Sequence, residues 1–181
     1  MEYLLHTKDL KMVFHPSAMN LVCYADASYA THDDARSHFG ITMQLGASNA
    51  PFHNKSGVIK VVARSSTEAE IAALNELISE ILHTRDLLEE MGHSQPATLV
   101  YEDNTACIQL LEGPITNYQT RSRHIKVRYA FFKQYLESEE VILCHCPTIK
   151  MLADVYTKPL TGQKYTIFRD QLLGIRTRYR N

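Results

Sequence analysis

Residues 61–74 read VVARSSTEAEIAAL, and they mark the point where a series of short strands gives way to a long helix. An apolar run stops at Arg64, three hydroxyl residues follow, and two glutamates then stand two positions apart ahead of more apolar residues. Apolar residues continue at helical spacing until Gly92, which is a typical helix stop. The stretch therefore predicts a helix over residues 66–91 with acidic side chains in its first turns.

The two glutamates have different expected roles. Ser65 and Glu68 fit the capping box, in which Ser65 is the N-cap and the Glu68 carboxylate returns a hydrogen bond to the Ser65 amide. At about 100° per residue, Glu70 lies about 50° from the centre of the apolar stripe and Glu68 about 110° from it. Glu70 is therefore expected to point toward the sheet, where a carboxylate must be neutralised or bound to a cation. The alternative is a residue at the rim that reaches water.

Apolar residues at strand and helix spacing predict the remaining elements. In chain order these are strands at 20–29, 38–46 and 52–63, the long helix, a strand at 97–103, helices at 104–113 and 125–137, a strand at 141–146, and helices at 150–160 and 165–174. A bulge is expected at Ser56-Gly57. A strand meander followed by β–α–β units predicts an α/β fold with a mixed sheet and helices on its faces. A right-handed crossover would place the fourth strand parallel to the first.

Three aspartates can converge with Glu70 in such a fold. Asp26 lies inside an apolar strand, where Asp is disfavoured, and Asp103 follows a strand end, where turn and cap residues are also common. Asp154 lies in the apolar segment Met-Leu-Ala-Asp-Val-Tyr. Each acid alone has an ordinary structural explanation, but four that converge form the oxygen-rich site that Mg²⁺ or Mn²⁺ requires. Two such ions about 4 Å apart can clamp a phosphate, activate water and stabilise the leaving oxygen.

Composition excludes several classes of protein. The 181 residues are 45% apolar with 7 Gly and 6 Pro, so the chain is expected to form a globular core and not a disordered segment. No apolar run approaches the roughly 20 residues that span a bilayer, so no membrane partner is expected. Without a secretory signal the four cysteines are expected to be reduced. Cys144 and Cys146 flank His145, and buried strand cysteines are favoured over a metal site there.

Basic residues gather in one window although the net charge is only −1. No Asp or Glu occurs from residue 113 to residue 134, and the window contains Arg121, Arg123, His124, Lys126, Arg128 and Lys133. These side chains are candidates for contacts with nucleic-acid phosphates, and a solvated helix face is the alternative. Asn104 and Thr105 begin a helix directly after Asp103, which is also a plausible phosphate contact.

Five strings carry a resemblance to a known family. They are YADAS at 24–28, RSSTEAE at 64–70, YEDNTA at 101–106, RSRHIKVRYAFF at 121–132 and LADVYTKPL at 152–160. In this order the sequence resembles the ribonuclease H domain of copia-type LTR-retrotransposon Pol polyproteins, over about residues 20–160. Residues 3–17 are similar to the segment that joins reverse transcriptase to that domain. The implied divisions are a connection segment at 1–19, a ribonuclease H domain at 20–160, and a C-terminal helix and basic tail at 161–181.

The resemblance implies a fold, an activity and partners. The fold would be ribonuclease H-like, with a five-stranded mixed sheet of order 3-2-1-4-5. The activity would be hydrolysis of the RNA strand of RNA–DNA hybrids with two Mg²⁺ ions, for which Mn²⁺ can substitute. Asp26, Glu70, Asp103 and Asp154 would be the catalytic and metal-binding acids. The candidates for sensing the 2′-hydroxyl are Glu70 and main-chain groups near Ser28 and Ser65. The partners would be the hybrid and the reverse transcriptase of the same polyprotein, within cytoplasmic virus-like particles.

Departures from the family pattern keep alternatives open. Cellular members carry a histidine in the loop before the last aspartate, but residues 147–150 read Pro-Thr-Ile-Lys, and His145 on the preceding strand is a distant substitute at most. The tryptophan that is common after the second strand is absent. The alternatives are a catalytically silent scaffold of the same fold, an integrase-like nuclease, and a domesticated module that only binds nucleic acid. A glutamate on the first long helix and a late aspartate favour ribonuclease H over integrase.

Overall fold

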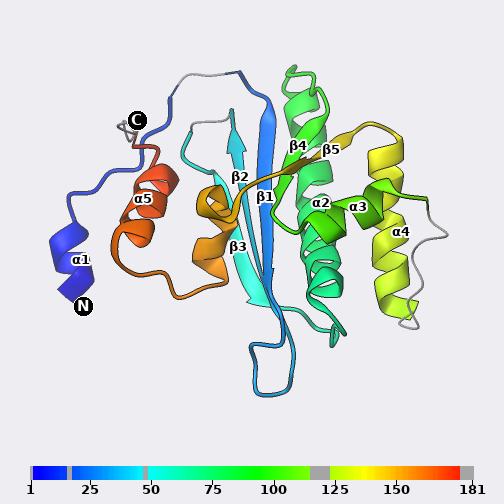
Figure 1. The fold of residues 1–181 in the computed structure, drawn as a ribbon. Coiled ribbons are helices and arrows are strands. Elements are labelled where there is room, and N and C mark those ends of the chain that lie inside the picture. The colour runs from blue at the N-terminus through cyan, green and yellow to red at the C-terminus, as the bar shows by residue number, and fades with distance from the viewer. Residues whose placement is uncertain (1, 16–17, 47–48, 115–122, 176–181) are drawn as a thin grey trace.

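The fold is built on one five-stranded sheet in the order β3-β2-β1-β4-β5 (Figure 1). The computed structural model describes residues 2–15, 18–46, 49–114 and 123–175. The strands are β1 Leu21–Ser28, β2 His38–Leu45, β3 His53–Val58, β4 Thr98–Glu102 and β5 Val141–His145. The helices are α1 Glu2–Thr7, α2 Ser66–Glu90, α3 Thr105–Glu112, α4 Arg123–Glu137 and α5 Gly162–Leu172, with 3-10 turns η2 Thr148–Lys150 and η3 Leu152–Tyr156. This order confirms the predicted α/β, ribonuclease H-like sheet.

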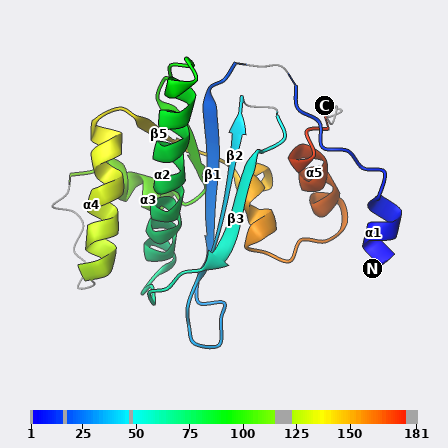
Figure 2. The ribbon, with the colours of Figure 1, turned by 180° about the vertical axis from the view of Figure 1, so that it is seen from behind.

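Helices cover both faces of the sheet (Figures 1 and 2). On one face α2, α3 and α4 pack over a core that includes Ile41, Leu74, Val100 and Phe132. On the other face η3 and α5 pack over a smaller cluster that includes Tyr24, Leu152 and Phe168. Apolar residues on both sides of β1 follow from its central position, because a strand covered on both faces has no solvent side.

Strand direction brings the ends of distant segments together. β1 pairs antiparallel with β2, where Asp26 lies opposite Gly40, and parallel with β4, where Tyr24 lies opposite Tyr101. Because β1 and β4 run in the same direction, their carboxyl ends lie at the same end of the sheet. In Figure 1 α2 and α4 also begin at this lower end of the molecule. The candidate acids therefore meet there.

Two local predictions are wrong. The register between β2 and β3 continues without interruption through Ser56 and Gly57, so there is no bulge at these residues. The glycine instead makes room for an aromatic ring, since a Cβ at residue 57 would lie 3.0 Å from the Phe39 ring. Residues 150–160 were expected to be helical but form the short turn η3, which ends ahead of Pro159. A proline disfavours the helical conformation in the residue before it.

The N-terminal segment packs beside the end of the chain. The Val13 amide donates to the Leu173 carbonyl at 2.8 Å, and the His15 ring contacts the Gly174 carbonyl at 2.9 Å. Tyr3 and Tyr165 share a hydrogen bond between their hydroxyls. Within the described part of the chain, all helices are too short or too polar to cross a membrane. All four cysteines are free thiols, as expected.

Candidate functional site

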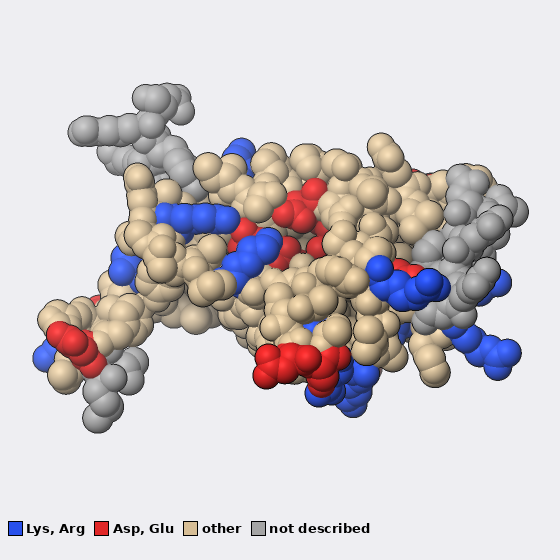
Figure 3. Space-filling view, turned by 60° about the horizontal axis from the view of Figure 1, so that its bottom comes forward, with Lys and Arg blue, Asp and Glu red and all other residues tan. Residues whose placement is uncertain are grey.

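Five carboxylates gather at the lower end of the sheet in two groups that share Asp103. Asp26, Asp103 and Asp154 each offer an oxygen within 4.8 Å of the others, and Glu70, Glu102 and Asp103 do the same. Figure 3 shows acidic side chains at the bottom of a hollow, with basic side chains beside it. The structure thus brings together the four acids singled out in the sequence and adds Glu102 to them.

Each acid is held by a different element. Asp26 lies in the middle strand of the sheet, Glu70 in the second turn of α2, and Asp103 just beyond β4. Asp154 is fully buried in η3, which lies against β2. Gly40 permits this approach, because a Cβ there would lie 2.6 Å from the Tyr156 Cβ and 2.9 Å from the Ala153 carbonyl oxygen.

Gly40→Ala is expected to displace η3 and to weaken cation binding. Backbone and a Cβ cannot yield as a flexible side-chain end can, so we expect a loss of about 1–3 kcal/mol in the free energy of unfolding. Mn²⁺ affinity should fall as well, because Asp154 moves with η3. Gly57→Ala is the control, since its Cβ would meet only Phe39. Urea unfolding and a Mn²⁺ titration of both variants check this, and wild-type Mn²⁺ affinity in Gly40→Ala would contradict it.

Two lysines form ion pairs with Asp26 and Asp154 of the first group. The Lys158 ammonium lies 3.1 Å from Asp26 Oδ1 and 2.6 Å from Asp154 Oδ1. The Lys164 ammonium lies 2.7 Å from Asp154 Oδ2. Burial alone would lower the pKa of Lys158, but the two carboxylates outweigh burial and raise that pKa. The Thr157 hydroxyl donates to the second oxygen of Asp26. Without a metal ion, Asp26 and Asp154 are therefore compensated by cations of the chain itself.

Lys158→Met is expected to destabilise the metal-free protein and to tighten divalent-ion binding. Removing one partner leaves buried carboxylates uncompensated, and because Lys158 is 37% exposed we expect a loss of about 1–3 kcal/mol. Mg²⁺ should then restore more stability to the variant than it adds to the wild type. Urea unfolding with EDTA or Mg²⁺ measures both effects. Lys55→Met, which removes surface pairs to Glu76 and Glu80, is the control; equal responses in the two variants would contradict the expectation.

The second group has no such cation. Within the described residues no lysine or arginine forms an ion pair with Glu70, Glu102 or Asp103. One oxygen each of Glu70 and Glu102 is buried without a hydrogen-bond partner among the residues that the structure describes. Burial, followed by the charges of Glu102, Asp26 and Asp103, raises the pKa of Glu70 well above its usual range. Burial also raises the pKa of Glu102 to about 8. Buried, unpaired carboxylate oxygens at this spacing fit a hard divalent cation.

The raised pKa of Glu102 predicts a pH dependence of stability. Its pKa is about 8 in the folded chain and ordinarily 4.5, so between these values the unfolded chain is ionised while the folded chain keeps the proton. Stability from this group is therefore fully present below about pH 4.5 and is lost as the pH rises through about 8. The difference in unfolding free energy between wild type and Glu102→Gln should fall over that interval. Urea unfolding in EDTA at about pH 5 and about pH 8 measures it, and a constant difference would contradict it.

The capping prediction holds for Ser65 and fails for the Glu68 carboxylate. The Ser65 hydroxyl accepts from the Glu68 amide at 3.2 Å, as an N-cap should. The Glu68 carboxylate accepts from the Arg64 amide at 2.8 Å, one residue earlier than the capping box requires. Because its side chain folds back over this turn, Glu68 is only 8% exposed, although its position on the helical wheel predicted that it would point outward. Glu70 points inward, as predicted, and is 4% exposed.

The polar candidates for substrate contacts flank the acids. The Ser28 hydroxyl donates to the Thr157 carbonyl at 2.7 Å, which ties β1 to the segment after η3. Ser65 is exposed at the start of α2. Asn104 caps α3, where its side chain accepts from the Cys107 amide, and Thr105 is exposed in the first turn of that helix. Their contacts with nucleic acid stay predictions.

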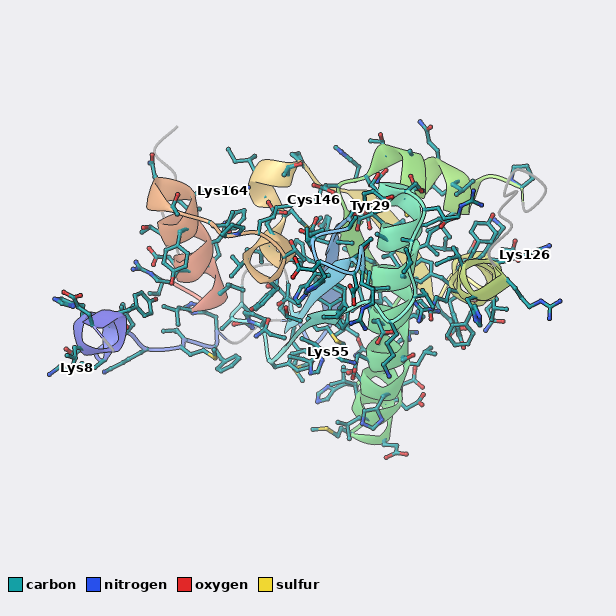
Figure 4. All side chains as sticks on the ribbon, turned by 90° about the horizontal axis from the view of Figure 1, so that it is seen from below. Lys8, Tyr29, Lys55, Lys126, Cys146 and Lys164 are labelled. Carbon is teal, nitrogen blue, oxygen red and sulfur yellow. The ribbon has the colours of Figure 1, made fainter. Side chains whose placement is uncertain are left out.

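The basic candidates divide into exposed and engaged side chains. Arg121 lies outside the described residues. Arg123 and Lys126 are exposed in the first turn of α4, and Figure 4 shows Lys126 on the far side of the sheet from Lys164 of α5. Arg128 is half-buried, 3.9 Å from Glu76 of α2. Lys133 was expected to bind phosphate but is buried, because its ammonium donates to the carbonyls of Leu111 and Gly113 at the end of α3.

Sequence comparison shows which known proteins this chain resembles. No family model matches the chain. It is 31% identical over 158 residues to the Retrovirus-related Pol polyprotein from transposon RE1 of Arabidopsis thaliana, an alignment that covers 86% of this chain and 10% of the polyprotein. The chain is thus similar to one part of the Pol polyproteins of transposons. It spans only 10% to 13% of the length of the first relatives of this kind.

Solved structures show which fold this Pol-related chain has. LC11-RNase H1 in complex with RNA/DNA hybrid superposes with a TM-score of 0.56 at 15% identity, over 75% of this chain and 92% of that one. The Prototype Foamy Virus Protease-Reverse Transcriptase CSH mutant gives a TM-score of 0.57 at 15% identity, over 85% of this chain and 23% of that one. At these identities the likeness establishes the ribonuclease H fold. Together with the relatives it confirms the resemblance to copia-type Pol polyproteins.

Proposed function

We propose that this domain hydrolyses the RNA strand of RNA–DNA hybrids with two Mg²⁺ ions, for which Mn²⁺ can substitute. The observation that carries the proposal is the pair of overlapping carboxylate groups at one end of the sheet, joined by Asp103. Bound there, the ions would activate water and stabilise the leaving oxygen of a phosphodiester. Hydrolysis would leave a 5′-phosphate and a 3′-hydroxyl.

The residues of the chain have separate tasks in this proposal. Asp26 and Asp154 would hold one ion after Lys158 and Lys164 have turned away, and Glu70 with Asp103 would hold the other. The Lys158 side chain is 37% exposed, so it can leave toward solvent without crossing the core. A displaced ammonium at the rim of the site would remain close enough to attract the phosphates of the substrate.

Several groups would bind the hybrid around this centre. Ser28 lies two residues after Asp26, and Ser65 lies five residues before Glu70. Ser28 and main-chain groups near Ser65 would meet the 2′-hydroxyl, which distinguishes RNA from DNA. Arg123 and Lys126 at the start of α4 would bind phosphates further away, with a salt-dependent affinity that does not depend on sequence. The hybrid bound to LC11-RNase H1 supports this substrate class.

The Pol relatives suggest where the reaction takes place. We infer that the domain acts beside the reverse transcriptase of the same polyprotein, since the foamy virus neighbour is a protease-reverse transcriptase. The segment before β1 would connect the two domains, and virus-like particles in the cytoplasm would enclose them. Removing template RNA during reverse transcription would be the purpose of the reaction.

A cleavage assay tests the proposal. RNA labelled at its 5′ end is annealed to DNA and incubated with the protein in Mg²⁺ or EDTA, beside single-stranded RNA and duplex DNA of the same sequence. The proposal predicts shortened RNA from the hybrid alone, and only with Mg²⁺ or Mn²⁺. Cleavage that persists in EDTA, or equal cleavage of single-stranded RNA, would refute it.

A catalytically silent scaffold is the second candidate. The observation in its favour is that Lys158 and Lys164 already neutralise Asp26 and Asp154, as a permanent structural ion-pair network would. This alternative predicts hybrid binding that is insensitive to divalent ions, with intact RNA after prolonged incubation. Fluorescence anisotropy of a labelled hybrid, measured with Mg²⁺ and with EDTA beside the cleavage assay, separates the two functions.

A further inference from the structure

Glu102 is a fully buried carboxylate that was not among the acids predicted to form the site. It is the last residue of β4, and its exposed fraction is 0%. Thr98 and Val100, two and four residues earlier, are buried as well, because alternate strand residues share one face. Glu102 therefore points to the α2 side of the sheet, beside the buried Cys107 of α3, whose pKa burial and then the Glu102 and Glu70 charges raise.

Only half of the Glu102 carboxylate has a structural partner. Its Oε1 accepts from the Asn104 amide at 3.0 Å, in the turn that leads into α3. Its Oε2 is buried and has no hydrogen-bond partner within the described residues. An amide side chain would accept the same bond from Asn104, so this bond alone does not require a carboxylate. A buried and unpaired acid oxygen is costly unless a further group binds it.

The unpaired oxygen belongs to the second carboxylate group. Glu70 also carries a buried oxygen that has no hydrogen-bond partner in the described part of the chain. Glu70, Glu102 and Asp103 each offer an oxygen within 4.8 Å of the others. Lysines of the chain reach Asp26 and Asp154 at 2.6–3.1 Å, but none is ion-paired with these three residues within the described part. Several carboxylate oxygens that lie close together without a cation are the ligands that Mg²⁺, Mn²⁺ or Ca²⁺ binds.

We propose that Glu102 is a direct ligand of the divalent cation held between Glu70 and Asp103, so that five carboxylates and not four form the metal centre. This inference rests on the metal site of the proposed function, but not on the substrate. In this proposal the ionised form of Glu102 is stabilised only when the ion is bound. The ion would also relieve the repulsion between Glu70 and Glu102.

Binding of Mn²⁺ alone, without nucleic acid, tests the inference. Free Mn²⁺ is counted by electron paramagnetic resonance during titration of wild type, Glu102→Gln, Glu70→Gln and Glu68→Gln. Glu102→Gln keeps the shape and the acceptor for Asn104 but loses the charge. Glu68→Gln is the matched control, because Glu68 is a buried glutamate of the same domain whose carboxylate accepts from Arg64. Circular dichroism melting curves establish that all four proteins are folded.

We expect Glu102→Gln to weaken the binding of one Mn²⁺ ion by about tenfold or more, as loss of a charged ligand does, while Glu68→Gln binds as the wild type does. If Glu102→Gln matches the wild type while Glu70→Gln does not, the fifth ligand is refuted and the metal site of the proposed function stands. A wild type that binds no Mn²⁺ overturns both. If Glu102→Gln alone loses Mn²⁺ affinity and the wild type does not cleave the hybrid, the result supports Glu102 as a metal ligand and refutes only the nuclease function.

Discussion

Asp26→Asn is expected to lower cleavage of the RNA–DNA hybrid by about a thousandfold or more, equivalent to about 4 kcal/mol in the barrier. Asp26 lies in the central strand, is 1% exposed, and is one of the three aspartates of the first carboxylate group. The amide keeps the size of the side chain and one acceptor oxygen, but it removes the charge that a divalent ion requires. The rate of RNA shortening under single-turnover conditions is the measurement.

Stability separates a catalytic loss from unfolding in this variant. Burial raises the pKa of Asp26, although Thr157 and Lys158 lower it in part. The ionised form is therefore less favourable in the fold than in water, and Asp26→Asn should cost little in the free energy of unfolding because Lys158 keeps its ion pair with Asp154. Urea unfolding in EDTA checks this. Wild-type cleavage by a folded Asp26→Asn protein would remove Asp26 from the site.

Glu70→Gln and Glu68→Gln are expected to differ sharply although the residues are two apart on one helix. Glu70→Gln should lower cleavage by about a thousandfold, because Glu70 belongs to the second carboxylate group and has a buried oxygen free for an ion. Glu68→Gln should leave cleavage nearly unchanged and cost about 1 kcal/mol or less, because the Glu68 carboxylate accepts from the Arg64 amide and belongs to neither carboxylate group.

The comparison within this pair is informative because both glutamates are almost equally buried. Cleavage rates and urea midpoints of the two variants are measured side by side. A stability loss in both would be compatible with the account, but cleavage must be lost only in Glu70→Gln. The reverse pattern, with Glu68→Gln inactive and Glu70→Gln active, would mean that the two roles were exchanged.

Local patterns were sufficient to predict the elements and the direction of Glu70. Alternation along β1 and the 3.6-residue spacing of α2 depend on residues near in sequence, so they could be recognised without coordinates. Glu102 could have been found in the same way, because Thr98 and Val100 share its face of β4 and point into the core. The prediction instead chose its neighbour Asp103, which follows the end of the strand.

Other features depend on contacts between distant segments. Lys158 follows Asp154 by four residues, but its contact with Asp26 exists only because η3 packs against β2 at Gly40. Glu68 is buried because its carboxylate accepts a hydrogen bond from the Arg64 amide and so lies over the start of the helix. A helical wheel does not include such a contact. Lys133 is likewise buried by the end of α3, a partner that is about twenty residues earlier in the chain.

Anomalous diffraction from crystals soaked in MnCl₂ addresses the claim on which the rest depends. The account predicts manganese peaks enclosed by Asp26, Asp103 and Asp154 and by Glu70, Glu102 and Asp103, with the ammonium groups of Lys158 and Lys164 moved off their aspartates. No peak among these five carboxylates, with both lysines still bound to Asp154 at high manganese concentration, would contradict it.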